Sequence, residues 1–200
     1  MEIARGLIII LITGVLTENF ILSKFLGICP FLGVSKKVSG SVGMGIAVIF
    51  VMVLGTAVTW PIYTFILAPL NVEYMRTIAF ILIVALFVQL IEMVLRRKMP
   101  LLYESLGAYL ALMVTNCAIL GVTLLNIDLE YGFLYSIFNA FCAGLGFLMV
   151  MVIFSGVRGR VDRCDIPKAL SGIPITFIAA SIMSLSFMGF AGLIEGIFGI

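Results

Sequence analysis

Histidine is absent from this sequence of 200 residues, and its absence excludes several classes of function. Without an imidazole, the chain cannot offer the usual side-chain ligand of haem and zinc, and it cannot form a histidine proton relay. A Ser-His-Asp catalytic triad is excluded for the same reason. Any metal site that this chain builds must therefore use sulfur or oxygen atoms.

Charged residues are also scarce. They make up 11% of the chain, whereas soluble globular proteins contain about 25%, and 63% of the residues are hydrophobic. This composition is typical of an integral membrane protein, whose first partner is the lipid bilayer. The formal net charge of +2 gives no reason to expect a nucleic acid as a partner.

Apolar runs long enough to cross a bilayer occur six times along the chain. A spanning helix needs about 20 residues, and these runs are continuous, which favours helices over the alternating strands of a barrel. The runs cover residues 7–34, 42–67, 77–95, 101–125, 133–157 and 173–198. The sequence therefore predicts an all-α membrane protein with six transmembrane helices, forming a single domain over residues 1–200.

The basic residues predict the orientation of these helices. Of the 12 lysines and arginines, only Arg5 and Arg76 fall on the outer side of a six-helix arrangement. Because Lys and Arg near helix ends stay preferentially in the cytoplasm, we expect both termini to face outward, into the periplasm of a Gram-negative cell. The first, third and fifth connections are then cytoplasmic.

One short string occurs twice, at corresponding places in the two halves of the chain. Cys29-Pro-Phe-Leu-Gly-Val34 is echoed by Cys117-Ala-Ile-Leu-Gly-Val122. Since each half contributes three crossings, the second half must enter the membrane from the opposite face. We therefore expect two inverted three-helix repeats, of about residues 1–98 and 99–200, with the two cysteines at equivalent depths.

Both cysteine-bearing helices are predicted to be broken. The first run is longer than one crossing needs and is interrupted by polar residues, and Pro30 favours the start of a new half-helix at Cys29. In the fourth run, Thr115 and Asn116 are good N-cap residues immediately before Cys117. The start of a helix carries unpaired amide donors and a partial positive charge, which favour the thiolate that binds metal.

Several neighbours of the two cysteines suit a metal site. Gly27, Gly33 and Gly121 would let the backbone approach a cluster closely. Lys24 could supply a compensating positive charge, although it could equally snorkel to the membrane surface or pair with Glu18.

Only two of the four cysteines, Cys29 and Cys117, occupy equivalent positions in the two repeats. A [2Fe-2S] cluster normally takes four cysteine ligands, so this chain would supply half a site, and a second subunit, identical or related, would supply the rest. Cys142 and Cys164 have no partner in the repeat, and we interpret them as incidental.

The stretches that carry these motifs also resemble a known family. Residues 24–37, Thr115-Asn-Cys-Ala-Ile-Leu-Gly-Val122 and Ser186-Phe-Met-Gly-Phe-Ala-Gly192 closely resemble the A-subunit family of the Rnf electron transport complex. The E subunit of the sodium-pumping NADH:quinone oxidoreductase is the near alternative. The resemblance covers essentially the whole chain.

The resemblance implies a six-helix inverted-repeat subunit of the cytoplasmic membrane of a bacterium or archaeon. It would pair with a homologous subunit of opposite topology, the E subunit in Rnf, and hold one [2Fe-2S] cluster through Cys29 and Cys117. Other subunits would carry flavin and further iron-sulfur centres. The complex passes electrons between ferredoxin and NAD, coupled to sodium or proton movement, and this chain is not catalytic alone.

Two other interpretations remain open from the residues. Inverted repeats and broken helices also occur in secondary transporters, which bind substrate at the membrane midplane without a redox cofactor. A membrane thiol-disulfide enzyme could use Cys29 and Cys117 as a dithiol, although the chain has no Cys-x-x-Cys pair of the kind such enzymes usually need.

Overall fold

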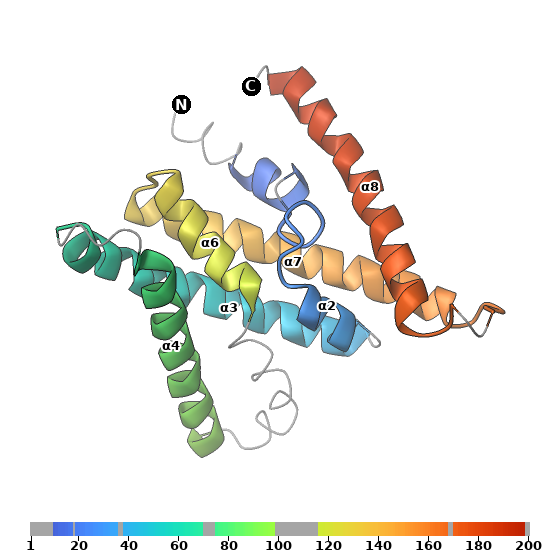
Figure 1. The fold of residues 1–200 in the computed structure, drawn as a ribbon, viewed down its shortest axis with the longest axis horizontal. Helices are drawn as coiled ribbons and strands as arrows, with labels where there is room; N and C mark the ends of the chain where they lie inside the picture. The colour runs from blue at the N-terminus through green and yellow to red at the C-terminus, as the bar shows by residue number, and fades with distance from the viewer. Residues whose placement is uncertain are drawn as a thin grey trace.

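The computed structural model describes residues 10–17, 19–35, 38–69, 75–98, 116–167 and 170–198, and these are helices joined by turns, with no strand among them (Figure 1). The predicted all-α fold is confirmed. The elements are η1 (Thr13–Thr17), α2 (Ile28–Val34), α3 (Val38–Ile62), η2 (Tyr63–Leu67), α4 (Arg76–Lys98), α6 (Cys117–Asp128), α7 (Phe133–Val161) and α8 (Ile173–Phe198).

The first apolar run does not form one continuous helix. Residues 10–12 are helical and lead into the π-helical turn η1, residues 19–27 form turns, and α2 begins at Ile28. Pro30 is therefore the third residue of α2 and not its first, where its missing N–H is still one of the four donors that a helix start leaves unpaired. Residues 101–115, where the fourth run was expected to begin, lie outside the described residues, and α6 starts at Cys117.

Helices α3 and α7 form the centre of the molecule. Together with η2, α3 forms a span of 30 residues and α7 one of 29, and among the described residues these are the two helices long and apolar enough to cross a membrane. They make the most extensive contact between any two elements. Shorter apolar helical stretches, within α4, α6 and α8, lie around this pair (Figure 1).

Two glycines allow α3 and α7 to approach closely. A Cβ on Gly45 would lie 3.2 Å from the Cα of Leu148, and one on Gly144 would lie 3.0 Å from the Cα of Ile49. Gly45 meets Leu148, whereas Ile49, four residues later in α3, meets Gly144, four residues earlier in α7, so the helices run antiparallel. Small residues at such crossings are how membrane helices maximise van der Waals contact, because lipid gives them no hydrophobic reason to associate.

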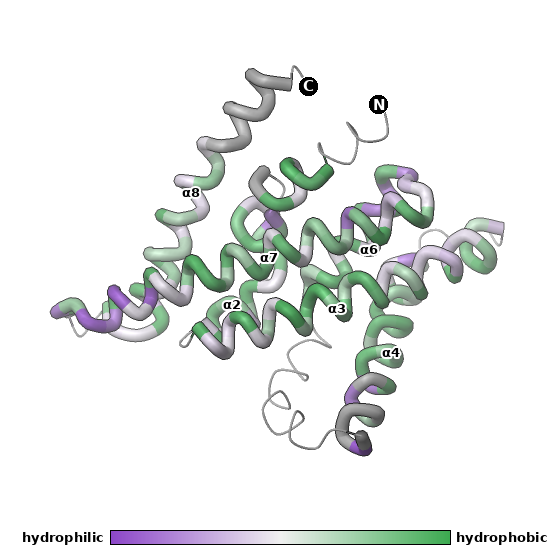
Figure 2. Tube along the Cα trace, turned by 180° about the vertical axis from the view of Figure 1, so that it is seen from behind, coloured by the Kyte–Doolittle hydropathy of each residue, from purple (hydrophilic) through white to green (hydrophobic). Residues whose placement is uncertain are grey.

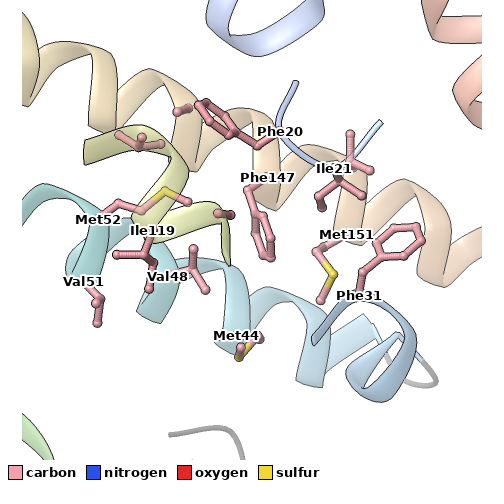
Figure 3. Close-up of a cluster of buried hydrophobic side chains, with 14 of the residues drawn as sticks. Phe20, Ile21, Phe31, Met44, Val48, Val51, Met52, Ile119, Phe147 and Met151 are labelled. Atoms are coloured by element: carbon pink, nitrogen blue, oxygen red, sulfur yellow. The ribbon is translucent and has the colours of Figure 1, made fainter. Parts of the chain in front are cut away.

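Large side chains fill the space around this crossing. Met44, Val48 and Met52 of α3 and Phe147 and Met151 of α7 belong to one buried cluster, which Figure 3 shows together with parts of α2 and α6. The apolar cluster therefore holds both cysteine-bearing helices against the central pair.

Polar contacts tie the helices together at both ends of the molecule. At one end, Arg158 of α7 donates from Nη1 to the carbonyl oxygen of Leu32 (2.7 Å) and to Ser35 Oγ (2.9 Å). At the other end, Arg76 of α4 forms an ion pair of 2.7 Å with Asp128 of α6. Figure 2 shows hydrophilic residues concentrated after α7, at the end of α4 and at the end of α6, with apolar helix between them.

Candidate functional site

Cys29 is an exposed residue in the first turn of α2. The chain enters this helix through a sharp turn in which Phe25 and Gly27 both have positive φ angles, of 56° and 81°. A hydrogen bond of 2.7 Å from the amide of Leu26 to the carbonyl oxygen of Phe20 closes the turn. The turn ends one helical stretch and starts another, so Cys29 stands at the break in the first apolar run.

Cys117 is the first residue of α6 and is also exposed. The helix is capped as the sequence predicted, since Asn116 has an extended backbone and its Oδ1 accepts a hydrogen bond of 3.0 Å from the amide of Ala118. This bond satisfies one of the unpaired donors of the helix start. Thr115, the other predicted cap, lies outside the described residues.

The starts of α2 and α6 are in direct contact. A Cβ on Gly27 would lie 3.1 Å from Asn116 Oδ1, 3.3 Å from the Cβ of Ala118 and 2.9 Å from Cε2 of Phe147. Only glycine fits at position 27, both because of these neighbours and because of its positive φ. We call Gly27, Cys29, Asn116 and Cys117 the α2–α6 junction, because Gly27 and Asn116 bring the two helix starts together.

The other predicted neighbours occupy different environments. Gly121 lies against the turn before α2, because a Cβ there would be 3.4 Å from Cε1 of Phe20. Pro30 is buried, whereas Lys24 is exposed. Gly33 is one turn after Cys29, on the same face of α2, and no described atom lies within 4 Å of the position that its Cβ would take. That face of α2 therefore leaves room for another molecule.

Cys142 and Cys164 are not part of the junction. Cys142 is buried in α7, where its Cβ would lie 3.5 Å from a Cβ on Gly14. Cys164 is exposed in the turn after α7, and its thiol lies 3.5 Å from the carbonyl oxygen of Arg160.

Two residues that support the junction were not predicted to do so. Asn19 is buried, and its Nδ2 donates to the carbonyl oxygens of Gly146 (2.9 Å) and Val15 (3.2 Å), while its Oδ1 accepts from the amide of Ile21. This amide fixes the interrupted segment to α7. Phe154 of α7 stacks on Phe31 of α2, with ring centroids 4.1 Å apart. In the sequence, Asn19 is visible only as a polar residue inside an apolar run. Its presence indicated that the helix is interrupted there, but not which group its side chain binds.

The junction suits half of an anionic metal-sulfur site. Within the described residues, no three His, Cys, Asp or Glu side chains come together, so a metal would have at most these two thiols as its sulfur ligands from this part of the chain. Asn116 is 5% exposed, and its Nδ2 is buried without a hydrogen-bond partner among the residues that the structure describes. An unsatisfied amide donor beside Cys117 would donate a hydrogen bond to a negatively charged sulfur group and thereby stabilise that charge.

Comparison with known proteins gives a consistent result over nearly the whole chain. Residues 7–194 match the sequence model of the family described as Rnf-Nqr subunit, membrane protein. The chain is 52% identical over 187 residues to the A subunit of the Na(+)-translocating ferredoxin:NAD(+) oxidoreductase complex of Acetobacterium woodii, a match covering 94% of this chain and 97% of that protein.

Two further relatives share one name, since each is the A subunit of an ion-translocating oxidoreductase complex. The protein from Syntrophotalea carbinolica is 48% identical over 192 residues, covering 96% of this chain and 100% of the relative. The protein from Serratia proteamaculans is 50% identical over 188 residues, covering 94% and 97% respectively.

Proposed function

The chain belongs to the Rnf-Nqr family of membrane subunits, and on that premise we propose that it relays electrons within the membrane through a [2Fe-2S] cluster shared with a second subunit. It is a membrane subunit of an ion-translocating ferredoxin:NAD oxidoreductase, as its identity to subunits of that name over nearly the whole chain indicates. The choice of the Rnf complex over the quinone-reducing relative is thereby confirmed. The cluster, its ligands and the partner subunit constitute the proposal.

The observation that carries the proposal is the contact between the starts of α2 and α6. Two segments far apart in the chain, each with a cysteine in its first turn, meet through Gly27 and Asn116, and both thiols are exposed. Cys164 is exposed as well, but it lies in the turn after α7 and not at this contact, so it is the meeting of the two helix starts that distinguishes Cys29 and Cys117. Cys29 and Cys117 are therefore the proposed ligands.

The residues of the junction have distinct roles in this proposal. When bound, the cluster would supply one-electron redox chemistry at a low-dielectric position. Cys29 and Cys117 would bind iron as thiolates, and the amide start of α6 would stabilise their negative charge. Asn116 would hold the backbone of that helix start through Oδ1 and donate a hydrogen bond through Nδ2 to a sulfur atom of the cluster. Phe147, which lies against Gly27, would exclude water from the α7 side of the junction.

The partner would cover the exposed side of the junction. Phe25, in the turn before α2, is 62% exposed, and Gly33 leaves open space on the same face of α2 as Cys29. A homologous subunit of inverted topology, the E subunit of the complex, would dock there and supply the two remaining thiolates. Flavin and iron-sulfur subunits would then donate and accept the electrons.

The architecture that we propose has six crossings in two inverted repeats, of about residues 1–98 and 99–200. Its support is the pairing of α3 with α7: Gly45 meets Leu148 and Gly144 meets Ile49, so each helix contributes a glycine and, four residues later, a branched side chain to the same crossing. A pseudo-two-fold axis in the membrane plane would produce this reciprocal pattern.

The polar contacts support the predicted orientation in the cytoplasmic membrane. Arg158 and the turn at Ser35 lie together at one end of the bundle, which we assign to the cytoplasm. Arg76 lies at the other end and is paired with Asp128, which offsets one of the two basic charges expected outside. Both termini would accordingly lie on the outer side.

Cys164 provides a native probe of this orientation. In inverted membrane vesicles, a membrane-impermeant maleimide should label Cys164, because the residue is exposed in the turn after α7. In intact spheroplasts the same reagent should not label Cys164, because it cannot reach the cytoplasmic side of the membrane. A Cys164→Ser variant, which should lose the label, is the control, and labelling from the outside alone would contradict the assigned orientation.

Metal analysis tests the proposed function directly. The chain and its homologous partner, co-expressed and purified in detergent, should contain about two iron atoms and about two acid-labile sulfides per pair. Dithionite reduction should generate the EPR signal of one [2Fe-2S] centre. A well-folded pair without iron would overturn the electron-relay proposal and favour a transport role without a cofactor.

A further inference from the structure

Helix α4 packs on the rest of the molecule through one narrow face. Phe80, Val84 and Val88, spaced four residues apart, are its buried side chains among those described. The helix contacts α3 and α6, and Figure 1 and Figure 2 both show it running away from the central pair of α3 and α7. Most of the surface of α4 is therefore left without a neighbour among the residues that the structure describes.

The opposite face of α4 carries a row of exposed side chains. Its members lie three or four residues apart, so they share one face of the helix, at the spacing by which two helices pack along a common seam. Four of them are apolar and are 57–63% exposed. We call this row the α4 seam; it consists of Ile78, Leu82, Leu86, Gln89, Met93 and Arg97.

Gln89 is the polar residue within the apolar part of the α4 seam. It follows Arg76, at the outer end of the helix, by thirteen residues, or about 20 Å. It precedes Arg97, at the cytoplasmic end, by eight residues, or about 12 Å. The side chain of glutamine is too short to reach water from this depth, so its carboxamide must be satisfied inside the membrane.

The carboxamide of Gln89 forms no hydrogen bond with any residue that the structure describes. Other exposed polar groups of the apolar helices are satisfied by their own backbone. Ser181 and Ser186 of α8, for example, each donate to the carbonyl oxygen four residues earlier, at 2.9 Å and 3.0 Å. Hydrocarbon against Gln89 would leave two N–H donors and one carbonyl oxygen unpaired, which is costly in a bilayer. Lipid is therefore a poor occupant of the α4 seam.

The cytoplasmic end of the α4 seam restricts the kind of protein that fits it. Two copies of this chain have the same orientation in the membrane, so a pair formed along the seam would place its two α4 helices parallel. The exposed side chain of Arg97 would then face its counterpart, and like charges in this position oppose association. A different chain with an acidic residue at this level complements the seam better than a second copy does.

We propose that the α4 seam binds a transmembrane helix of another subunit of the complex, which places a hydrogen-bonding side chain against Gln89 and an acidic side chain against Arg97. The apolar members of the seam supply van der Waals contact, and the carboxamide fixes the register, as a single polar residue does in other helix pairs. The seam lies on the face of α4 turned away from α3 and α6. The inference therefore goes beyond the proposed function and does not depend on the cluster.

Photo-crosslinking in the complete complex, in native membranes, tests which molecule occupies the seam. With p-benzoylphenylalanine in place of Leu86, irradiation should join this chain to another subunit, and the crosslinked peptide should map to a transmembrane helix with a polar side chain within one turn. Ile81 is 51% exposed but lies on the flank of α4, outside the seam. The same amino acid in place of Ile81 is the matched control and should give little or none of this product.

Three other products would overturn the proposal. Adducts with lipid alone would mean that the bilayer covers the α4 seam. A crosslinked pair of this chain would identify a second copy as the occupant. A crosslink within one chain, for example to residues 99–115, would show that the chain covers its own helix.

A substitution of Gln89 tests the hydrogen bond itself. Gln89→Leu in the complete complex should lower the amount of the crosslinked subunit retained after mild heating in detergent about threefold to tenfold, because leucine cannot replace an interhelical hydrogen bond. Ser181→Ala, whose hydroxyl is bonded within its own helix, is the matched control and should leave retention unchanged. Unchanged or higher retention in Gln89→Leu, as expected of a position that faces lipid, would overturn the inference. Neither measurement depends on iron, so the electron relay is tested separately.

Discussion

A complex in which Cys117 is replaced by alanine should assemble with all its subunits and yet lose the EPR signal of the proposed intramembrane [2Fe-2S] centre. Electron transfer from ferredoxin to NAD should fall to background in the same sample. The physical reason is that alanine offers no donor atom, and a cluster bridging two subunits has no spare thiolate in the described residues to take its place.

The variant should remain folded because Cys117 contributes little to packing. Its side chain is exposed, and the cap of α6 is formed by Asn116 and the amide of Ala118, which the substitution leaves intact. Thermal unfolding in detergent should therefore shift only slightly. A lost signal in a destabilised, disassembled complex would not count as support, so the stoichiometry of the subunits must be measured on the same preparation.

The other cysteines provide matched controls. Cys29→Ala should reproduce the loss, whereas Cys142→Ala and Cys164→Ala should keep the signal, because neither residue lies at the α2–α6 junction. Retention of the full signal in either Cys29→Ala or Cys117→Ala would show that the ligand lies elsewhere, and the proposed site would have to be abandoned.

Replacing Gly27 by valine should abolish the cluster with both thiols still present. The substitution forces a branched side chain into a positive φ of 81°, which costs about 1–2 kcal/mol. It also places carbon atoms against Phe147, Asn116 and Ala118, at distances where overpacking typically costs about 1–3 kcal/mol more. The start of α2 must move away from α6, and Cys29 moves with it.

Gly172 provides the control for this prediction. Its φ is 92°, so Gly172→Val suffers a similar backbone strain, but no described atom lies within 4 Å of the position of its Cβ. This variant should lower the melting temperature modestly and keep its iron. Gly27→Val should lose both stability and iron. Equal iron content in the two variants would mean that the contact between α2 and α6 does not set the position of the ligand.

Much of the helical layout could be predicted from the apolar runs. The run over residues 173–198 coincides with α8, and the start of the 133–157 run coincides with the start of α7. The N-cap at Asn116 was predictable too, because capping is local chemistry that depends on one side chain and the next few amides. These features need no knowledge of distant parts of the chain.

The contacts between helices could not be predicted in the same way. Helices such as α3 are apolar on all sides, so the pattern of residues does not show which face meets a neighbour. The binding of Asn19 to Gly146, the hydrogen bonds of Arg158 to the end of α2 and the seat of Gly27 against Asn116 all join distant segments. The repeat of the cysteine string indicated which residues matter but not how they are brought together.

The shortness of α2 has a consequence for biogenesis. Seven residues cannot persist as a helix by themselves, and α2 depends on Phe154 and Arg158, the latter 126 positions away from Leu32 in the chain. The ribosome therefore delivers Cys29 to the bilayer long before the scaffold that orients it exists. Loading of the proposed cluster must wait until α7 has been inserted, by which time Cys117 has also been synthesised. The proposed early ligand, Cys29, is therefore not held in place while the nascent chain is still incomplete.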